Sequence, residues 1–192
     1  GPGALIPRPD SEVLIASAIE HFEGSDGPEC ILDLGTGPGT LLLAALDLWQ
    51  QAKGIGIDSS HQALAYAWAN ARRLGLEGRS DFRLGDWAEG VKGPFDLILC
   101  NPPYVATGAE VGAGVAEFEP AEALFAGPAG LDALRRLAPA FPRLLGRGGL
   151  AAVEIGADQA AGAANLLGIK GLSARIASDL GGRPRVALLT WA

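Results

Sequence analysis

The sequence predicts an α/β fold, a mostly parallel sheet covered by helices on both faces. Short apolar runs alternate with stretches of helical periodicity, which is typical of a doubly wound sheet. The run Phe95–Cys100 is almost continuously apolar, as expected for a parallel strand buried on both faces. A glycine-rich turn at Gly35–Gly39 separates the apolar run Ile31–Leu34 from a second apolar stretch, which indicates a strand followed by a helix.

The expected elements alternate along the whole chain. Strands are expected at Ile31–Leu34, Gly54–Asp58, Phe82–Leu84, Phe95–Cys100, Leu150–Ile155, near Ala174 and at Arg185–Thr190. The first expected helix is capped by Asp10 or Ser11 and carries Leu14, Ala18 and Phe22 on one stripe. A later helix is capped by Ser59 or Ser60 and carries Leu64, Trp68 and Ala71 on one face. Further helices are expected at Leu41–Leu46, at about Leu131–Leu145, and in an alanine-rich stretch after residue 155. The long connection Val105–Pro128 has little periodicity, which favours a binding loop.

The most informative motif is Asn101-Pro102-Pro103-Tyr104, directly after the strand at Phe95–Cys100. Two prolines cannot continue a strand ladder, so the chain must turn there. In such a corner the Asn101 side-chain oxygen and the Pro102 carbonyl can each accept one N–H of a planar NH₂ group, and the Tyr104 ring can pack on its plane. The alternative is a plain strand-to-loop turn.

The glycine turn and the next strand suggest a nucleotide-like ligand. Glycines let the backbone approach a ligand closely, and the following helix N-terminus has free N–H groups. A nicotinamide fingerprint needs a third glycine where this chain has Thr40. Asp58 ends the second strand, where related folds bind ribose hydroxyls with a carboxylate. The alternative for Asp58 is a role in capping the next helix.

Composition narrows the function classes. The chain has 192 residues, 48% of them hydrophobic, enough for one domain with a real core. It lacks an apolar run long enough to cross a membrane and a signal-peptide pattern, so a soluble cytoplasmic protein is expected. With 22 acidic and 15 basic residues, the net charge of −7 disfavours direct binding to nucleic acid and favours a protein substrate.

Neither the cysteines nor the histidines indicate a metal site. Cys30 and Cys100 are expected at opposite ends of neighbouring strands, too far apart for a disulfide. His21 and His61 are isolated, without partners at ligand spacing. No metal is expected.

Together these motifs resemble the class I S-adenosylmethionine-dependent methyltransferases, and more closely the HemK/PrmC family of protein-glutamine N5-methyltransferases. The glycine turn and the NPPY motif are shared with other amino-group methyltransferases. The segments that are similar to this family in particular are Pro7–Glu12 and the stretch from Phe118-Glu119-Pro120 through Gly148-Gly149 to Glu154-Ile155-Gly156. The resemblance fades into Asp179–Arg183.

The resemblance implies a seven-stranded, mostly parallel Rossmann-like sheet, S-adenosyl-L-methionine as methyl donor and S-adenosyl-L-homocysteine as product. It implies a catalytic domain at 30–192 behind an N-terminal segment and helix at 1–29, with the family's small N-terminal helical domain absent. The implied substrate is the glutamine of the GGQ motif in class 1 peptide chain release factors. The sequence does not fix the oligomeric state, and a monomer is expected.

The resemblance also implies a role for each site residue. The cofactor's methionine part would lie against Gly35, Thr36, Gly37, Pro38 and Gly39, its ribose against Asp58, and its adenine against Asp86 and Trp87, with Arg8 closing over it and Asn101 beside it. The catalytic and substrate-binding residues would be Asn101, Pro102, Pro103 and Tyr104. Trp87 could instead be core filler and Arg8 a surface residue. For Glu119 and Glu154 a structural role is expected.

Four rival functions remain open from the sequence. An adenine-N6 or guanine-N2 nucleic-acid methyltransferase could use the same grip on an amino group. A related enzyme could methylate a glutamine of another protein, such as a ribosomal protein. The chain could also be a non-catalytic cofactor-binding module. A nicotinamide dehydrogenase fits poorly, because Thr40 replaces the third glycine and no catalytic His or Tyr-Lys pair is evident.

Overall fold

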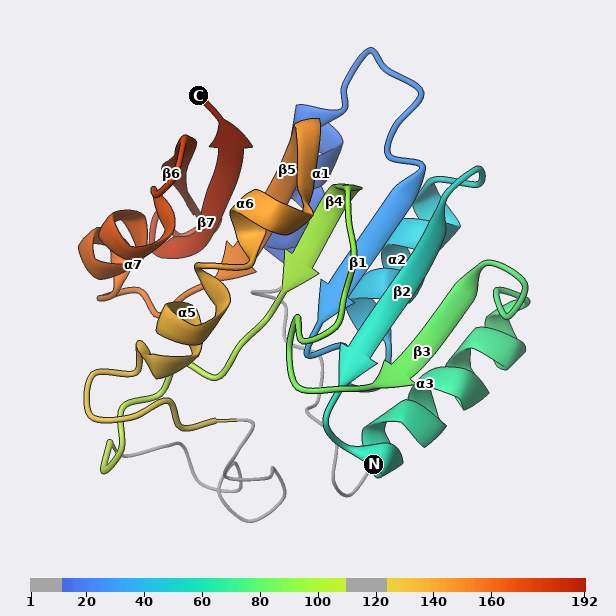
Figure 1. Ribbon diagram of the computed structural model, residues 1–192, viewed down its shortest axis with the longest axis horizontal. Helices are drawn as coiled ribbons and strands as arrows, with labels where there is room; N and C mark the ends of the chain where they lie inside the picture. Colours follow the sequence, from blue (N-terminus) through green and yellow to red (C-terminus); the bar gives the residue numbers. More distant parts are fainter. Residues whose placement is uncertain (1–11, 110–123) are drawn as a thin grey trace.

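A seven-stranded sheet organises the chain in a computed structural model that describes residues 12–109 and 124–192 (Figure 1). The strands are β1 (Cys30–Leu34), β2 (Lys53–Asp58), β3 (Ser80–Leu84), β4 (Phe95–Cys100), β5 (Leu145–Glu154), β6 (Leu172–Ser178) and β7 (Pro184–Trp191). Their order is β3-β2-β1-β4-β5-β7-β6. The first five strands are parallel, and β7 runs antiparallel to both β5 and β6. The predicted fold class is confirmed.

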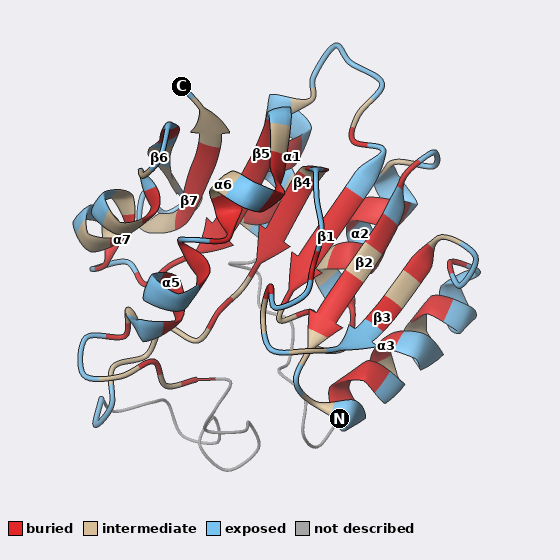
Figure 2. Cartoon of the chain, viewed as in Figure 1, coloured by how far each residue is buried: buried red, intermediate tan, exposed pale blue. Residues whose placement is uncertain are grey.

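Helices cover both faces of this sheet. One face carries α1 (Glu12–His21), α2 (Thr40–Leu48) and α3 (His61–Leu74), and the other carries α5 (Asp132–Leu137), α6 (Phe141–Leu144) and α7 (Ala160–Leu167). The central strands divide their side chains between the two cores. In β4, Leu97 and Leu99 join the cluster under α1–α3, whereas Ile98 and Cys100 join the cluster under α5–α7. Such strands are buried on both sides (Figure 2), which explains their almost continuous apolar sequence.

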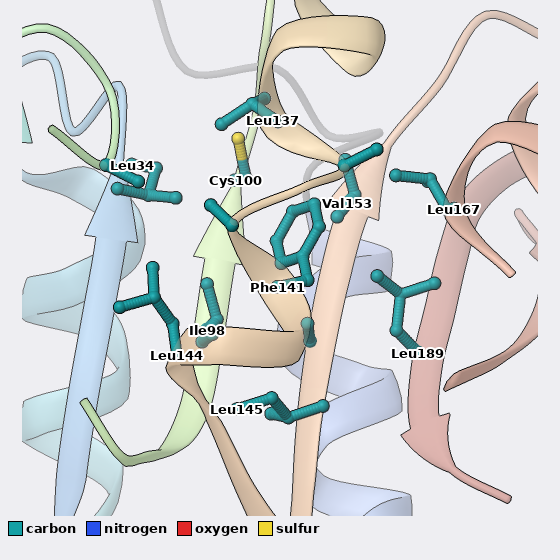
Figure 3. Packing of buried hydrophobic residues seen from close by; sticks show 14 of the residues in the cluster. Leu34, Ile98, Cys100, Leu137, Phe141, Leu144, Leu145, Val153, Leu167 and Leu189 are labelled. Atoms are coloured by element: carbon teal, nitrogen blue, oxygen red, sulfur yellow. The ribbon is translucent and has the colours of Figure 1, made fainter. Parts of the chain in front are cut away.

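The prediction of one helix at Leu131–Leu145 is wrong. The segment forms two short helices, α5 and α6, and Leu145 already belongs to β5. Pro139 and Pro142 explain the break, because neither has the N–H that a continuous helix would need. Pro142 is instead accommodated in the first turn of α6, where an N–H would have no helical partner. Figure 3 shows Phe141 of α6 packed against Val153 of β5.

The fifth strand is longer than the predicted Leu150–Ile155. It begins at Leu145 and includes Gly146, Gly148 and Gly149, which weaken the strand signal in the sequence. At Gly149 the neighbouring strand comes close, because a Cβ atom there would lie 2.6 Å from the Asp96 carbonyl oxygen. The glycine therefore allows the strand to pass close to β4.

The two described ends of the long connection after β4 are paired with each other. Val105 and Phe125 form a parallel bridge, and the Val105 N–H donates to the Leu124 carbonyl at 2.8 Å. The Thr107 N–H donates to the Gly127 carbonyl at 2.9 Å. These bonds hold the two ends together. The expected helix caps Asp10 and Ser11, and also Arg8 and Glu119, lie outside the described residues.

The cysteines lie where the sequence placed them. Cys30 begins β1, and Cys100 ends β4, where it is opposite Leu34. Four residues of strand separate the two thiols, about 13 Å, which is too far for a disulfide. Both cysteines are free, Cys30 exposed and Cys100 buried, and burial raises the pKa of the Cys100 thiol. Among the described residues, no helix has the length and apolar character needed to cross a bilayer.

Candidate functional site

A cavity of about 580 Å³ opens at the carboxyl edge of the sheet. Its lining includes residues that follow four neighbouring parallel strands: Gly35 and Gly37 after β1, Asp58 and Ser60 at the end of β2, Asp86 and Trp87 after β3, and Asn101 and Pro103 after β4. Residues of the 125–127 segment and of α5 also contribute to the lining. Parallel strands place their following loops at one edge, where open α/β sheets bind ligands. The structure therefore brings the four predicted segments together.

The glycine turn approaches the cavity through its backbone. Gly35 and Gly37 line the cavity with φ angles of 73° and 55°, a region that side chains disfavour. A Cβ atom at Gly35 would lie 3.2 Å from the Trp87 ring and 3.9 Å from the Asn101 carbonyl oxygen. Because Gly35 has no side chain, the space between the glycine turn, Trp87 and the NPPY corner stays open.

The other turn residues have supporting positions. Thr36 is buried, and its hydroxyl donates to Asp33 at 2.7 Å. The Pro38 carbonyl accepts a hydrogen bond from Asn70 of α3 at 3.0 Å. Gly39 caps the start of α2 in a left-handed conformation. These three residues fix the shape of the turn, while Gly35 and Gly37 present its backbone to the cavity.

Asp33 is a buried acid that the sequence analysis did not single out. It is only 1% exposed in β1, and burial raises its pKa from 3.8 to about 7. The Thr36 hydroxyl bonds to Oδ2 and opposes this shift, whereas Oδ1 has no hydrogen-bond partner among the described residues. A carboxylate with one unsatisfied oxygen is costly to bury, so the Asp33 carboxyl keeps its proton up to about pH 7.

The raised pKa of Asp33 predicts a loss of stability as the pH increases. Between about pH 4 and pH 7 the folded chain keeps a proton that the unfolded chain has released, so the free energy of unfolding falls through this window. The side chain in Asp33→Asn cannot ionise. We therefore expect the free energy of unfolding of this variant to exceed that of wild type by a few kcal/mol at pH 8, since one unit of pKa shift corresponds to about 1.36 kcal/mol. Urea unfolding at pH 4–8 measures the difference.

The control for this prediction is Asp26→Asn, a change of an exposed aspartate. Its unfolding free energy should follow the wild-type pH profile throughout. Parallel profiles for Asp33→Asn and wild type would contradict the assignment.

Asp58 braces the start of the next helix, as one of its two predicted roles requires, and it also lines the cavity. Its Oδ2 accepts the Gly37 N–H at 2.7 Å, and its Oδ1 accepts the Ser60 N–H at 2.9 Å. The Ser60 hydroxyl in turn accepts the Ala63 N–H at 3.2 Å and caps α3. Asp58 thus braces the glycine turn against the start of α3 and also lines the cavity. Each carboxylate oxygen has a second lone pair that can accept a ligand hydroxyl.

Asp86 and Trp87 form the wall after β3. Trp87 is half-buried, packs against the core cluster under α5–α7, and has a φ of 52°. It is therefore both part of the core boundary and part of the cavity wall. The Asp86 carboxylate is exposed and accepts a hydrogen bond from Arg136 of α5 at 2.6 Å.

Two arginines that the sequence analysis missed support this wall. Arg136 lines the cavity and forms the ion pair with Asp86 across 50 residues of sequence. Arg143 of α6 donates to the Val91 carbonyl and to the Ala88 carbonyl, the latter at 3.1 Å, and so ties the loop after Trp87 to the helix. No local signal identifies either residue, because basic residues near a helix end are usually solvated.

The NPPY corner leaves β4 directly into the cavity wall. Asn101 and Pro103 line the cavity, Pro102 is buried, and Tyr104 is half-buried. Glu154, at the end of the neighbouring strand β5, is buried. Among the described residues, no group of three or more His, Cys, Asp or Glu side chains is arranged to hold a metal ion.

The cavity has the properties required to bind a nucleoside-containing cofactor. Its volume lies in the range of small-molecule sites. It offers carboxylate acceptors from Asp58 and Asp86, aromatic surface from Trp87 and Phe125, and exposed backbone at Gly35. A Cβ atom at Gly35 would narrow this space beside Trp87.

Comparisons with known proteins agree with this geometry. A family model described as "Methyltransferase domain" matches residues 26–138. A release factor glutamine methyltransferase of Rhodospirillum rubrum is 47% identical over 98% of this chain and 58% of that protein. A protein of the same name from Xylella fastidiosa is 41% identical over 96% of this chain and 67% of that protein. The chain spans about three fifths of the length of the Rhodospirillum relative.

A solved structure is similar over the whole chain. A methyltransferase from Pyrococcus furiosus has a TM-score of 0.69 and 22% identity, covering 100% of this chain and 86% of that one. At this identity the likeness supports the fold alone.

Proposed function

We propose that this chain, which belongs to the release factor glutamine methyltransferase family, transfers a methyl group from S-adenosyl-L-methionine to a glutamine side-chain nitrogen. The acceptor is the glutamine of the GGQ motif in class 1 release factors, and the chain acts as a cytoplasmic monomer on protein rather than nucleic acid. The observation behind this proposal is that the NPPY corner and the glycine turn line one cavity. Residues 30–192 are proposed as the catalytic domain.

One wall of the cavity is assigned to the methyl donor. Asp58 would accept the ribose hydroxyls with lone pairs that Gly37 and Ser60 leave available. Asp86 would accept the adenine amino group while Arg136 holds its carboxylate in place, and Trp87 would pack on the adenine ring. The segment Gly35–Gly39 would approach the methionine part. S-adenosyl-L-methionine supplies an electrophilic methyl group on a sulfonium.

The adjoining part of the cavity, after β4, is assigned to the amide. An amide nitrogen is a weak nucleophile because its lone pair is delocalised into the carbonyl. Asn101 Oδ1 and the Pro102 carbonyl would accept the two amide N–H groups, and Tyr104 would pack on the amide plane. These contacts aim the nitrogen lone pair into the cavity. Positioning of this kind can contribute about 7–11 kcal/mol in favourable cases.

No strong base is required before the attack. The nitrogen–carbon bond forms as the carbon–sulfur bond breaks, and the methylated nitrogen becomes acidic enough to release its proton to water. Asn101 Oδ1 and the Pro102 carbonyl would each keep one N–H hydrogen bond until one of the two protons leaves. We therefore propose that no His, Cys or Ser nucleophile takes part.

Mass spectrometry of a class 1 release factor tests the proposal. After incubation with the chain and S-adenosyl-L-methionine, we expect one added methyl group on the GGQ glutamine. A release factor with that glutamine replaced by glutamate should remain unmodified. Ribosomal proteins, DNA and RNA in parallel reactions separate the rival acceptors, and methylation of nucleic acid alone would overturn the proposal. Equilibrium binding of S-adenosyl-L-methionine against NAD separates the dehydrogenase.

A further inference from the structure

Gln159 links three segments at the acceptor side of the cavity. It follows β5, immediately precedes α7, and is only 8% exposed. Its Nε2 donates to the Tyr104 carbonyl at 2.8 Å, and also to the carbonyls of Gly130 at 3.1 Å and Ala129 at 3.3 Å. Its Oε1 accepts the Gly156 N–H at 2.9 Å. One buried amide thereby joins the NPPY corner to the 129–130 segment and to the loop after β5.

Two glycines pack closely against this amide. Gly130 has a φ of 67°, and a Cβ atom there would lie 2.2 Å from the Tyr104 carbonyl oxygen and 2.4 Å from Gln159 Nε2. A Cβ atom at Gly156 would lie 3.1 Å from the Gln159 side chain. The Gln159 amide is therefore in close contact with the backbone at Gly130 and at Gly156, and Gly130 also packs against the Tyr104 carbonyl.

The chemistry of the corner explains why such a link is needed. Pro102 and Pro103 have no N–H groups, so the backbone there cannot be fixed by donation to a neighbouring strand. A carbonyl oxygen can still be held by a donor from elsewhere, and Gln159 supplies this donor at Tyr104. The hydrogen bond from the Val105 N–H to the Leu124 carbonyl is a further backbone anchor.

We propose that Gln159 is a positioning residue, whose buried amide fixes the Tyr104 carbonyl so that Asn101 and the Pro102 carbonyl face the methyl donor. This inference rests on the proposed function. Gln159 itself does not touch the substrate, and it acts through the backbone of the corner. Its loss should lower the rate of methyl transfer and leave the donor wall of the cavity unchanged.

The substitution Gln159→Glu separates positioning from a general structural role. When protonated, the new carboxyl group can still accept the Gly156 N–H and donate one hydrogen bond to the Tyr104 carbonyl. When ionised, it faces three carbonyl oxygens and cannot donate. Burial raises the pKa of such a group. The adjoining segments carry three acids: Asp158 beside Gly156, Glu154 at the end of β5, and Asp132 at the start of α5. As carboxylates they would raise the pKa of the new carboxyl group further.

We expect kcat of Gln159→Glu at pH 8 to fall by about 10²-fold, a typical result of a small misplacement in an active site. The affinity for S-adenosyl-L-methionine should stay at the wild-type value. As the pH is lowered toward 6, the ratio of variant to wild-type kcat should rise. Hydrogen exchange in the peptide 101–109, measured against wild type at the same pH, should be faster at pH 8 and approach wild type at pH 6.

Gln51→Glu is the matched control, because it adds the same charge at an exposed position. Gly130→Ala is a second test, because the added Cβ atom would disturb the contact between Gln159 and the Tyr104 carbonyl. Its control is Gly148→Ala, since Gly148 also has a positive φ and a Cβ atom there would have no neighbours within 4 Å. Wild-type turnover in the same assay reports on the proposed function separately. The inference is overturned if Gln159→Glu matches wild type at pH 8, if its defect is independent of pH, or if donor affinity falls with kcat.

Discussion

Asn101→Ala is expected to lower turnover by about 10²–10³-fold, comparable to the loss of one preorganised hydrogen-bonding group in an active site. Asn101 lines the cavity directly after β4. The proposed role of its side-chain oxygen is to accept one amide N–H and orient the nitrogen, and alanine cannot do this. The affinity for S-adenosyl-L-methionine should remain close to wild type, because the donor wall is built from residues after β1, β2 and β3. Single-turnover kinetics and calorimetry measure the two quantities.

Two further variants sharpen this test. Asn101→Asp keeps an oxygen acceptor and should retain more activity than Asn101→Ala. Asn165→Ala removes an exposed asparagine from α7 and should leave both quantities unchanged. Wild-type turnover by Asn101→Ala would refute the assignment of the amide grip.

Asp58→Ala is expected to have the opposite kinetic signature. The Kd for S-adenosyl-L-methionine should rise by about 10²-fold, since a hydrogen bond to a charged group contributes about 1.5–3 kcal/mol. The variant also loses the bond that fixes the Gly37 N–H at 2.7 Å, which loosens the glycine turn. At saturating donor, kcat should recover most of its wild-type value because the acceptor corner is untouched. Calorimetric titration and initial rates at several donor concentrations measure these effects.

The control for this second prediction is Asp47→Ala, which removes an exposed carboxylate from α2. Ser60 still caps α3 in Asp58→Ala, so the helix should persist by circular dichroism. An unchanged Kd would show that Asp58 serves the helix cap and the turn alone.

The fold was predictable where local sequence and tertiary environment agree. Strands such as β4 are apolar because both faces are covered, and the glycine turn and the NPPY corner stand out because glycine and proline change the backbone itself. The order of these segments along an α/β sheet was enough to place them at one edge. Nothing beyond residue types and spacing was needed for that part.

The remainder depends on contacts between distant residues. Arg136 reaches Asp86 across 50 positions, and Gln159 reaches Tyr104 across 55, and neither contact leaves a local pattern. Asp33 resembles any acid before a glycine turn until its burial under α2 is known. The single helix predicted at Leu131–Leu145 is wrong because Pro139 and Pro142 divide that segment into two short helices.

The order of the strands divides the work of the cavity between two consecutive stretches of chain. Asp58, Asp86, Trp87 and the glycine turn, which are assigned to the donor, follow β1, β2 or β3, whereas the residues assigned to the acceptor follow β4. The two stretches adjoin where β1 pairs with β4. Substitutions after β4 could therefore change the methyl acceptor, while the residues after β1, β2 and β3 continue to bind the same methyl donor. One scaffold could in this way give rise to enzymes that use the same methyl donor and methylate different acceptors.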